Sequence, residues 1–170
     1  GTDIMVEVPF SKKYNGSYLV NYRYSSLAML DNAGIVDFDG VPKYQDLGFK
    51  FMLPARKFGT FSIFGLGGKS NIAVTEEDAA GEVAGEGDYD AHVGVVGLNY
   101  TLSFNPNTLM KVTLAASGNG SRYDWHEPDT VNQMQLDSRA DWDKSSLRAS
   151  FMFSSKLNQR NRVVTGLTFT

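Results

Sequence analysis

Hydrophobic and polar residues alternate with a period of two along most of this chain, which is the pattern of a two-faced β-strand. In the clearest run, Leu98 and Tyr100 lie on either side of Asn99. The pattern predicts eight strands, at Thr2–Val8, Ser17–Met29, Tyr44–Leu53, Thr60–Gly68, His92–Phe104, Leu109–Ser117, Ser146–Ser155 and Arg162–Thr170. We therefore expect an all-β fold, an antiparallel up-and-down meander of about eight strands in one domain over residues 1–170.

The connections between these strands alternate between short and long. The short connections are Pro54–Gly59, Asn105–Asn107 and Asn158–Asn161, and the long ones are Asp31–Pro42, Lys69–Asp90 and Arg122–Lys144. Outer-membrane barrels combine tight turns at one end with long polar loops at the other. Several predicted strands also reach the ~9–11 residues that a tilted strand needs to cross a bilayer core. The pattern favours an outer-membrane-type β-barrel, or a segment of one, although a soluble barrel or sandwich also alternates.

The phase of this alternation places both chain ends on the side of the long loops, which is extracellular in outer-membrane barrels. Small complete barrels place both termini in the periplasm, so the chain is expected to be an excerpt of a larger barrel. Its start lacks the features of a signal peptide, and Leu167–Thr170 lacks a terminal aromatic residue. Because cut sheet edges invite pairing, we expect the strands to close on themselves or to self-associate through their edges.

Composition limits the chemistry that this chain can perform. A net charge of −3 over 170 residues offers no basic surface for nucleic acid. The absence of cysteine removes disulfides, thiol nucleophiles and cysteine-ligated metals. The two histidines, His92 and His126, lie too far apart for a metal-ligand motif. With no Ser-His-Asp set in a plausible placement, we expect no enzyme activity, no cofactor and no metal site.

The long connection Arg122–Lys144 carries both tryptophans of the chain, next to acidic residues. Aromatic rings stack on sugar faces and carboxylates accept hydrogen bonds from hydroxyl groups, so this combination suits a glycan. The candidate ligand-contact residues are Tyr123, Trp125, Trp142, Asp124 and Asp141. The same aromatic residues would also fit an interfacial belt or the packing of the loop itself.

Four further segments allow specific predictions. The acidic residues of Thr75–Asp90 are oxygen ligands of the kind Ca²⁺ prefers, but they lack EF-hand spacing, and a solvated mobile surface loop is the favoured interpretation. The glycines of Gly65–Gly68 predict a bend or bulge in the wall. Asn15–Gly16 and Asn119–Gly120 predict turns or bulges.

Three stretches of the chain carry a family resemblance: PFSKKYNGSYLVNYRYSSLAML (Pro9–Leu30), VPKYQDLGFKFMLPARKFGTFSIFGLGG (Val41–Gly68) and GVVGLNYTLSFNPNTLMKVTLAASG (Gly94–Gly118). They resemble the early barrel of TonB-dependent outer-membrane receptors, in the subgroup that carries a carboxypeptidase-like regulatory domain. The resemblance covers most of the chain in order, and the long connections diverge. It implies a location in the outer membrane of a Gram-negative bacterium, with lipid around the barrel.

The resemblance also implies a function, which is part of the wall of a receptor that takes up a nutrient such as a glycan or a peptide. The family's barrel has about 22 strands around a plugged lumen, whereas this chain has about eight and shows no plug domain, TonB box or regulatory domain. One alternative is a small stand-alone outer-membrane barrel with a structural or binding role. Another is a soluble eight-stranded, lipocalin-like barrel that binds a ligand inside, although the Gly-x-Trp motif usual near the start of lipocalins is not seen here.

Overall fold

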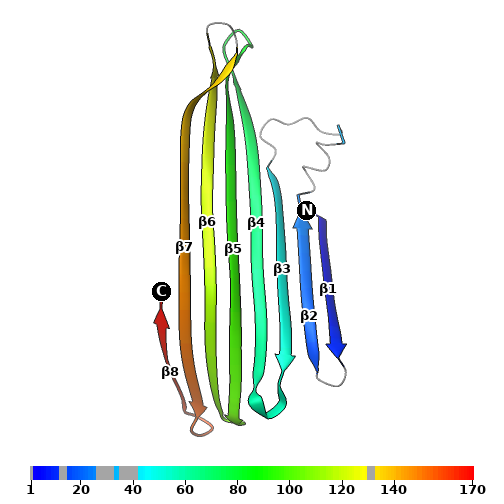
Figure 1. The fold of residues 1–170 in the computed structure, drawn as a ribbon, viewed down its shortest axis with the longest axis vertical. Coiled ribbons are helices and arrows are strands. Elements are labelled where there is room, and N and C mark those ends of the chain that lie inside the picture. Colours follow the sequence, from blue (N-terminus) through cyan, green and yellow to red (C-terminus); the bar gives the residue numbers. More distant parts are fainter. Residues whose placement is uncertain (1, 12–14, 26–32, 35–41, 130–132) are drawn as a thin grey trace.

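The structure is a computed structural model that describes residues 2–11, 15–25, 33–34, 42–129 and 133–170. It is one antiparallel sheet whose strands follow one another in chain order (Figure 1). The elements are β1 (Thr2–Ser11), β2 (Gly16–Tyr24), β3 (Lys43–Pro54), η1 (Arg56–Phe58), β4 (Thr60–Glu77), β5 (Val83–Asn105), β6 (Thr108–Pro128), β7 (Met134–Lys156) and β8 (Arg162–Phe169). The predicted all-β meander of eight strands is confirmed. Over the described ranges, no helix is long and apolar enough to cross a membrane.

Four central strands are much longer than the sequence pattern predicts, and they rise above their neighbours in Figure 1. Most of Lys69–Asp90 and most of the described part of Arg122–Lys144, both expected to be long loops, instead extend β4–β5 and β6–β7 as paired strands. These two predicted loops, including the mobile acidic loop Thr75–Asp90, are therefore wrong. Backbone pairing continues there because the hydrogen bonds between strands are made by main-chain groups. Charged side chains that interrupt the apolar alternation therefore do not prevent it. Most of Asp31–Pro42 and the predicted strand end at Met29 lie outside the described residues.

The short connections are tight turns at the other end of the sheet, as predicted. The η1 turn is closed by a hydrogen bond of 2.7 Å from the Ala55 amide to the Gly59 carbonyl, and Gly59 has a φ of 89°, which favours glycine. In the last turn, the Asn158 side-chain oxygen accepts hydrogen bonds from the amides of Arg160 and Asn161, both at 2.9 Å. These side-chain contacts reproduce a turn that the asparagine-rich sequence favours.

The long β4–β5 hairpin ends in a turn organised by Asp78. Its Oδ1 atom accepts hydrogen bonds from the amides of Ala80 at 2.8 Å and Glu82 at 3.0 Å, and Gly81 has a φ of 82°. The hydrogen bonds from Glu82 and then Ala80 lower the pKa of the Asp78 carboxyl below its ordinary value, because they favour its charged form. The tip of this hairpin is therefore a defined turn.

This turn should weaken in acid. A carboxyl whose pKa is lowered on folding stabilises the folded state above its unfolded pKa, and it loses that contribution as the pH falls through the folded value. We expect the protection of the Ala80 and Glu82 amides against hydrogen exchange, relative to their intrinsic exchange rates, to fall below about pH 4. In D78N, exchange should be faster at neutral pH and should no longer show this acid step. An acid step of equal size in D78N would contradict the assignment.

Glycines allow large rings to lie flat across neighbouring strands. A Cβ atom at Gly97 would overlap the ring of Phe64, and a Cβ atom at Gly65 would overlap the ring of Phe49. Gly65–Gly68 pairs in regular register with both β3 and β5, so the predicted bend or bulge there is wrong. These glycines make room for aromatic rings that lie across neighbouring strands, and the strand pairing continues without interruption.

The two Asn-Gly pairs have different structures. Asn15 lies in a turn with a φ of 51°, as predicted. Asn119 and Gly120 lie within β6 and pair regularly with β5 and β7, so the predicted turn or bulge at this site is wrong. Asn-Gly favours a turn only where the chain reverses, and here pairing on both sides of β6 keeps the chain extended.

The sheet stays open. Over the residues described, β1 pairs only with β2, and β8 pairs only with β7. Closure of the eight strands on themselves, one of the two expected outcomes, is therefore wrong for this structure. The short β1, β2 and β8 do not extend along the full height of the central strands, so both edges of the sheet are shorter than its centre. Self-association through these edges stays a prediction.

Candidate functional site

Strand register assigns every side chain of the sheet to one of two faces. Residues directly opposite each other in antiparallel strands project from the same face, and neighbours along a strand project from opposite faces. We call these the Leu98 face and the Asn99 face. Leu98 pairs with Ile63 and Leu114, and Asn99 pairs with Ser62 and Thr113. All register irregularities lie near strand ends, so the assignment holds through the body of the sheet.

The Leu98 face carries an apolar belt in the half of the sheet nearest the short turns. Its residues on the central strands are Phe61, Ile63, Val96, Leu98, Tyr100, Leu102, Met110, Val112, Leu114, Ala116, Leu147, Ala149, Phe151 and Phe153. The belt continues onto β3 with Leu47, Phe49, Phe51 and Leu53, and onto β8 with Val163, Leu167 and Phe169. Many of these side chains are exposed, including Leu114 at 50% and Leu147 at 76%. Monomeric soluble proteins rarely expose contiguous apolar patches of more than a few hundred Å².

The apolar belt ends at a row of small residues on the same face: Gly67, Gly94, Gly118 and Ser145. We call this the small-residue row. Beyond it, the Leu98 face becomes charged, and we call this part the ionic belt. Its members are Lys69, Asp88, Asp90, His92, Arg122, Asp124, Arg139, Asp141 and Asp143. One face of continuous strands therefore changes from apolar to ionic within a few residues.

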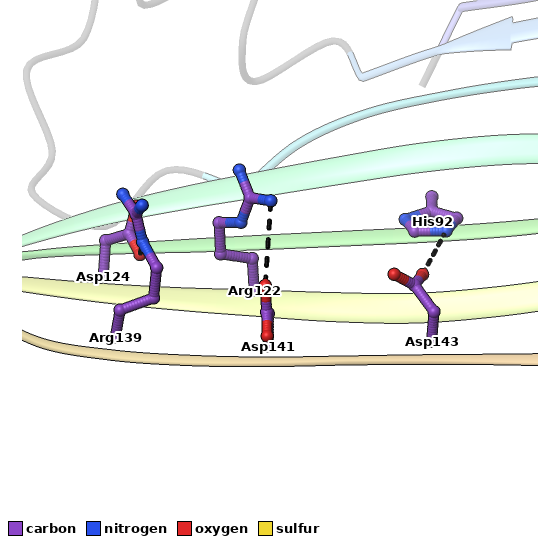
Figure 2. A network of polar contacts seen from close by, with 6 residues as sticks. All are labelled: His92, Arg122, Asp124, Arg139, Asp141 and Asp143. Atoms are coloured by element: carbon purple, nitrogen blue, oxygen red, sulfur yellow. Dashed lines mark hydrogen bonds and ion pairs between the residues drawn. The ribbon is translucent and has the colours of Figure 1, made fainter.

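Figure 2 shows that the ionic belt is organised into cross-strand pairs. Arg139 binds Asp124 through two hydrogen bonds, of 2.6 Å from Nε and 2.7 Å from Nη2. Arg122 Nη2 lies 3.9 Å from the Oδ2 atom of Asp141. Exposed ion pairs of this kind each contribute only ~0–1 kcal/mol to stability. Their main physical effect is to make this part of the face hydrophilic.

One pair spans a third strand. His92 on β5 and Asp143 on β7 both lie in register with Gly120 on β6, and their Nε2 and Oδ1 atoms are 3.1 Å apart. A Cβ atom at Gly120 would overlap the Asp143 carboxylate and would lie 2.8 Å from His92 Cε1. The glycine therefore leaves the space above the middle strand in which the two side chains meet.

The Asn99 face has the opposite arrangement. Opposite the apolar belt it is mainly polar, with Ser62, Asn99, Thr101, Lys111, Thr113, Ser117, Ser146, Arg148 and Ser150. Opposite the ionic belt it becomes aromatic, with Tyr89, Tyr123, Trp125 and Trp142, which we call the aromatic platform. The polarity of both faces is thus exchanged across the small-residue row.

The aromatic platform is built on glycines. The Trp125 indole lies across β5, where a Cβ atom at Gly85 would overlap it and one at Gly87 would lie 3.0 Å from it. The rings of Tyr123 and Trp125 are stacked, with centroids 6.4 Å apart at an angle of 18°. Trp125 Nε1 donates a hydrogen bond of 3.0 Å to Glu127. Trp142 is 53% exposed, so its ring is open to a ligand.

The structure separates the predicted ligand-contact residues into two groups. Tyr123, Trp125 and Trp142 share the Asn99 face, whereas Asp124 and Asp141 lie on the Leu98 face. Each carboxylate forms an ion pair with an arginine of the ionic belt, Asp124 with Arg139 and Asp141 with Arg122. The combination of rings and carboxylates suggested by the sequence is therefore not assembled, although the three aromatic residues do lie on one surface.

A hollow of about 370 Å³ lies beside the aromatic platform, over β3, β4 and β5. Arg23, Tyr44 and Asp46 border it from β2 and β3. Arg23 donates hydrogen bonds of 2.9 and 2.7 Å to a single oxygen of Asp46, and its guanidinium carbon lies 5.4 Å from the centre of the Tyr44 ring. These contacts fix the orientation of the Tyr44 ring at the border of the hollow.

Tyr44, Arg23 and Asp46 could not be selected as site residues from the sequence alone. Tyr44 shares a row with Trp142 through the register of five strands, and periodicity within one strand does not reveal register between strands. Gly68 was the available signal for Asp46, because a Cβ atom at Gly68 would lie 3.0 Å from the Asp46 Cβ atom, and such glycines mark close approach of another group to the backbone.

No metal centre is found among the described residues, where His, Cys, Asp and Glu form no group of three or more suited to a metal ion. His92 pairs with Asp143, and His126 lies opposite Leu136 near the far end of β6. The acidic residues of Thr75–Asp90 are distributed along two paired strands and their turn.

Comparison with known proteins adds no assignment. A scan against protein-family models, a search of curated proteins and a search of solved structures each found no match to this chain.

Proposed function

We propose that this chain forms part of the barrel wall of a TonB-dependent outer-membrane receptor that takes up a nutrient into a Gram-negative cell. The main observation that supports this proposal is the apolar belt. It crosses the sheet from β3 to β8 on one face, whereas the same strands are mainly polar on the other face. Both faces would have a favourable environment if lipid hydrocarbon covered the apolar belt and a water-filled lumen lay against the polar face.

The dimensions of the apolar belt also suit a bilayer. On β5 it extends from Val96 to the end of the strand near Asn105, which approaches the ~9–11 residues of a tilted membrane-crossing strand. The small-residue row would then lie at the outer edge of the hydrocarbon layer. The ionic belt beyond it would lie among polar headgroups or in water, where its charges keep their hydration.

Both alternative functions require a closed sheet. A stand-alone small barrel and a lipocalin-like barrel would each join β1 to β8, and the described parts of these strands do not pair. In a larger receptor wall, each edge strand would instead continue the sheet through another neighbour. The open sheet therefore favours the receptor wall over the other two candidates.

Single-cysteine labelling tests the proposal cleanly, because the chain contains no cysteine. Cysteine would be placed at Leu98 and Leu114 on one face, and at Asn99 and Ser117 on the other, in the complete gene product in outer membranes. We expect fluorophores at the first two sites to be quenched by acyl-chain quenchers, and those at the last two by aqueous iodide. Equal access of iodide to both faces would contradict a lipid-facing belt.

A further inference from the structure

One row of the Asn99 face has a distinctive order of large and small side chains. Successive strands β3 to β7 contribute Tyr44, Ser70, Ala91, Ser121 and Trp142 to this row, each in register with the next. Two aromatic residues thus border three small ones. Four strand spacings of ~4.8 Å separate the two outer strands, so the row spans about 19 Å. We call this arrangement the trough.

The trough is a surface formed by side chains, with its backbone already satisfied. The floor strands β4, β5 and β6 pair on both sides along this row, so they have no free main-chain ladder for an extended peptide. The hollow of about 370 Å³ occupies its β3–β5 half, and Tyr123 of the aromatic platform lies diagonally next to Trp142. A ligand would therefore contact rings, hydroxyl groups and methyl groups.

The charge of the trough favours a neutral, hydroxyl-rich ligand. Arg23 and Asp46, which border the hollow, neutralise each other, and both arginine contacts use the same carboxylate oxygen. The second Asp46 oxygen and the remaining guanidinium donors can accept from and donate to neighbouring hydroxyl groups. Aromatic rings at both ends offer flat apolar surfaces with which sugar rings can stack.

From these features we propose that the trough binds a short neutral oligosaccharide across strands β3 to β7, with sugar rings against Tyr44 and Trp142. This inference depends on the proposed function, because it places the trough on the lumenal side of the wall, above the hydrocarbon layer. It identifies the ligand class of that wall and its two end contacts. Asp124 and Asp141 take no part, because they lie on the other face.

The test measures binding to the complete receptor in detergent. Short neutral oligosaccharides of glucose, galactose and mannose would be compared with neutral peptides of similar size, using tryptophan fluorescence and calorimetry. We expect at least one oligosaccharide to bind, Y44A and W142A each to weaken it about tenfold, and W142F to retain most of the affinity. D141N is the matched control, since it changes the neighbouring residue on the opposite face, and it should bind like the wild type.

Three results would overturn the inference: binding of no oligosaccharide, oligosaccharide binding that W142A leaves unchanged, or peptide binding that depends on Tyr44 and Trp142. The amount of each variant in the outer membrane reports its folding, and W142F guards against a loss caused by instability. The cysteine labels at Leu98 and Asn99 report the membrane arrangement separately. If those labels behave as expected and the oligosaccharides fail, only the trough assignment falls.

Discussion

Replacing Leu114 with arginine is expected to destabilise the protein in a bilayer by about 2–4 kcal/mol, the cost of a cationic side chain on the lipid-facing surface near the midplane of a barrel. Leu114 lies within the apolar belt, directly opposite Leu98, and is 50% exposed. The guanidinium would have to lose its hydration or distort the nearby lipid. The measurement is the free energy of unfolding in urea for the protein in lipid vesicles.

S117R provides the matched control for this substitution. Ser117 is three residues further along β6, projects from the Asn99 face and is exposed. The same charge there would face the polar side of the sheet, so we expect the free energy of unfolding to change by less than about 0.5 kcal/mol. Equal losses in L114R and S117R would show that the two faces have similar surroundings, which would remove the main support for a membrane wall.

Replacing Gly97 with valine is the second substitution with a large expected effect, a loss of about 1–3 kcal/mol in the free energy of unfolding. The new Cβ atom would overlap the Phe64 ring and lie 3.0 Å from the Leu114 carbonyl oxygen, which is backbone and cannot turn away. The ring and the strand spacing would both have to shift. Urea unfolding in lipid vesicles measures this loss.

Gly94 gives a control on the same strand. No described atom lies within 4 Å of the position that its Cβ atom would occupy. Because valine suits an extended backbone better than glycine, G94V should be neutral or slightly stabilising. A loss in G94V as large as that in G97V would indicate that both substitutions act through the backbone and not through the Phe64 ring.

The strand pattern could be predicted from the sequence wherever apolar and polar residues alternate. His92–Phe104 was predicted as a strand because Leu98, Tyr100 and Leu102 share one side, and this segment forms the lower half of β5. The upper half was missed because the polarity of the two faces is exchanged there. Beyond Gly94, charges on the Leu98 face and aromatic residues on the Asn99 face resemble the composition of a loop, although the backbone continues as a paired strand.

The candidate site was only partly predictable for a related reason. Tyr123, Trp125 and Trp142 were selected by residue type, and the structure places all three on one face. The adjacent Asp124 and Asp141 were included because they are close in sequence, but neighbouring residues in a strand point to opposite faces. Tyr44 was missed because three strands lie between it and Trp142 in the sheet, and only the pairing of those strands places the two residues in one row.

The paired extension of β4–β7 beyond the small-residue row also predicts where this protein can change length during evolution. An insertion of one residue within Lys69–Glu76 or Arg122–Trp125 would shift the register and exchange the ionic and aromatic faces. An insertion at the Asp78–Gly81 turn would leave every strand pair in place. Homologues should therefore vary in length at this tip and keep constant spacing along the arms, and the tip is the natural position for an inserted epitope tag.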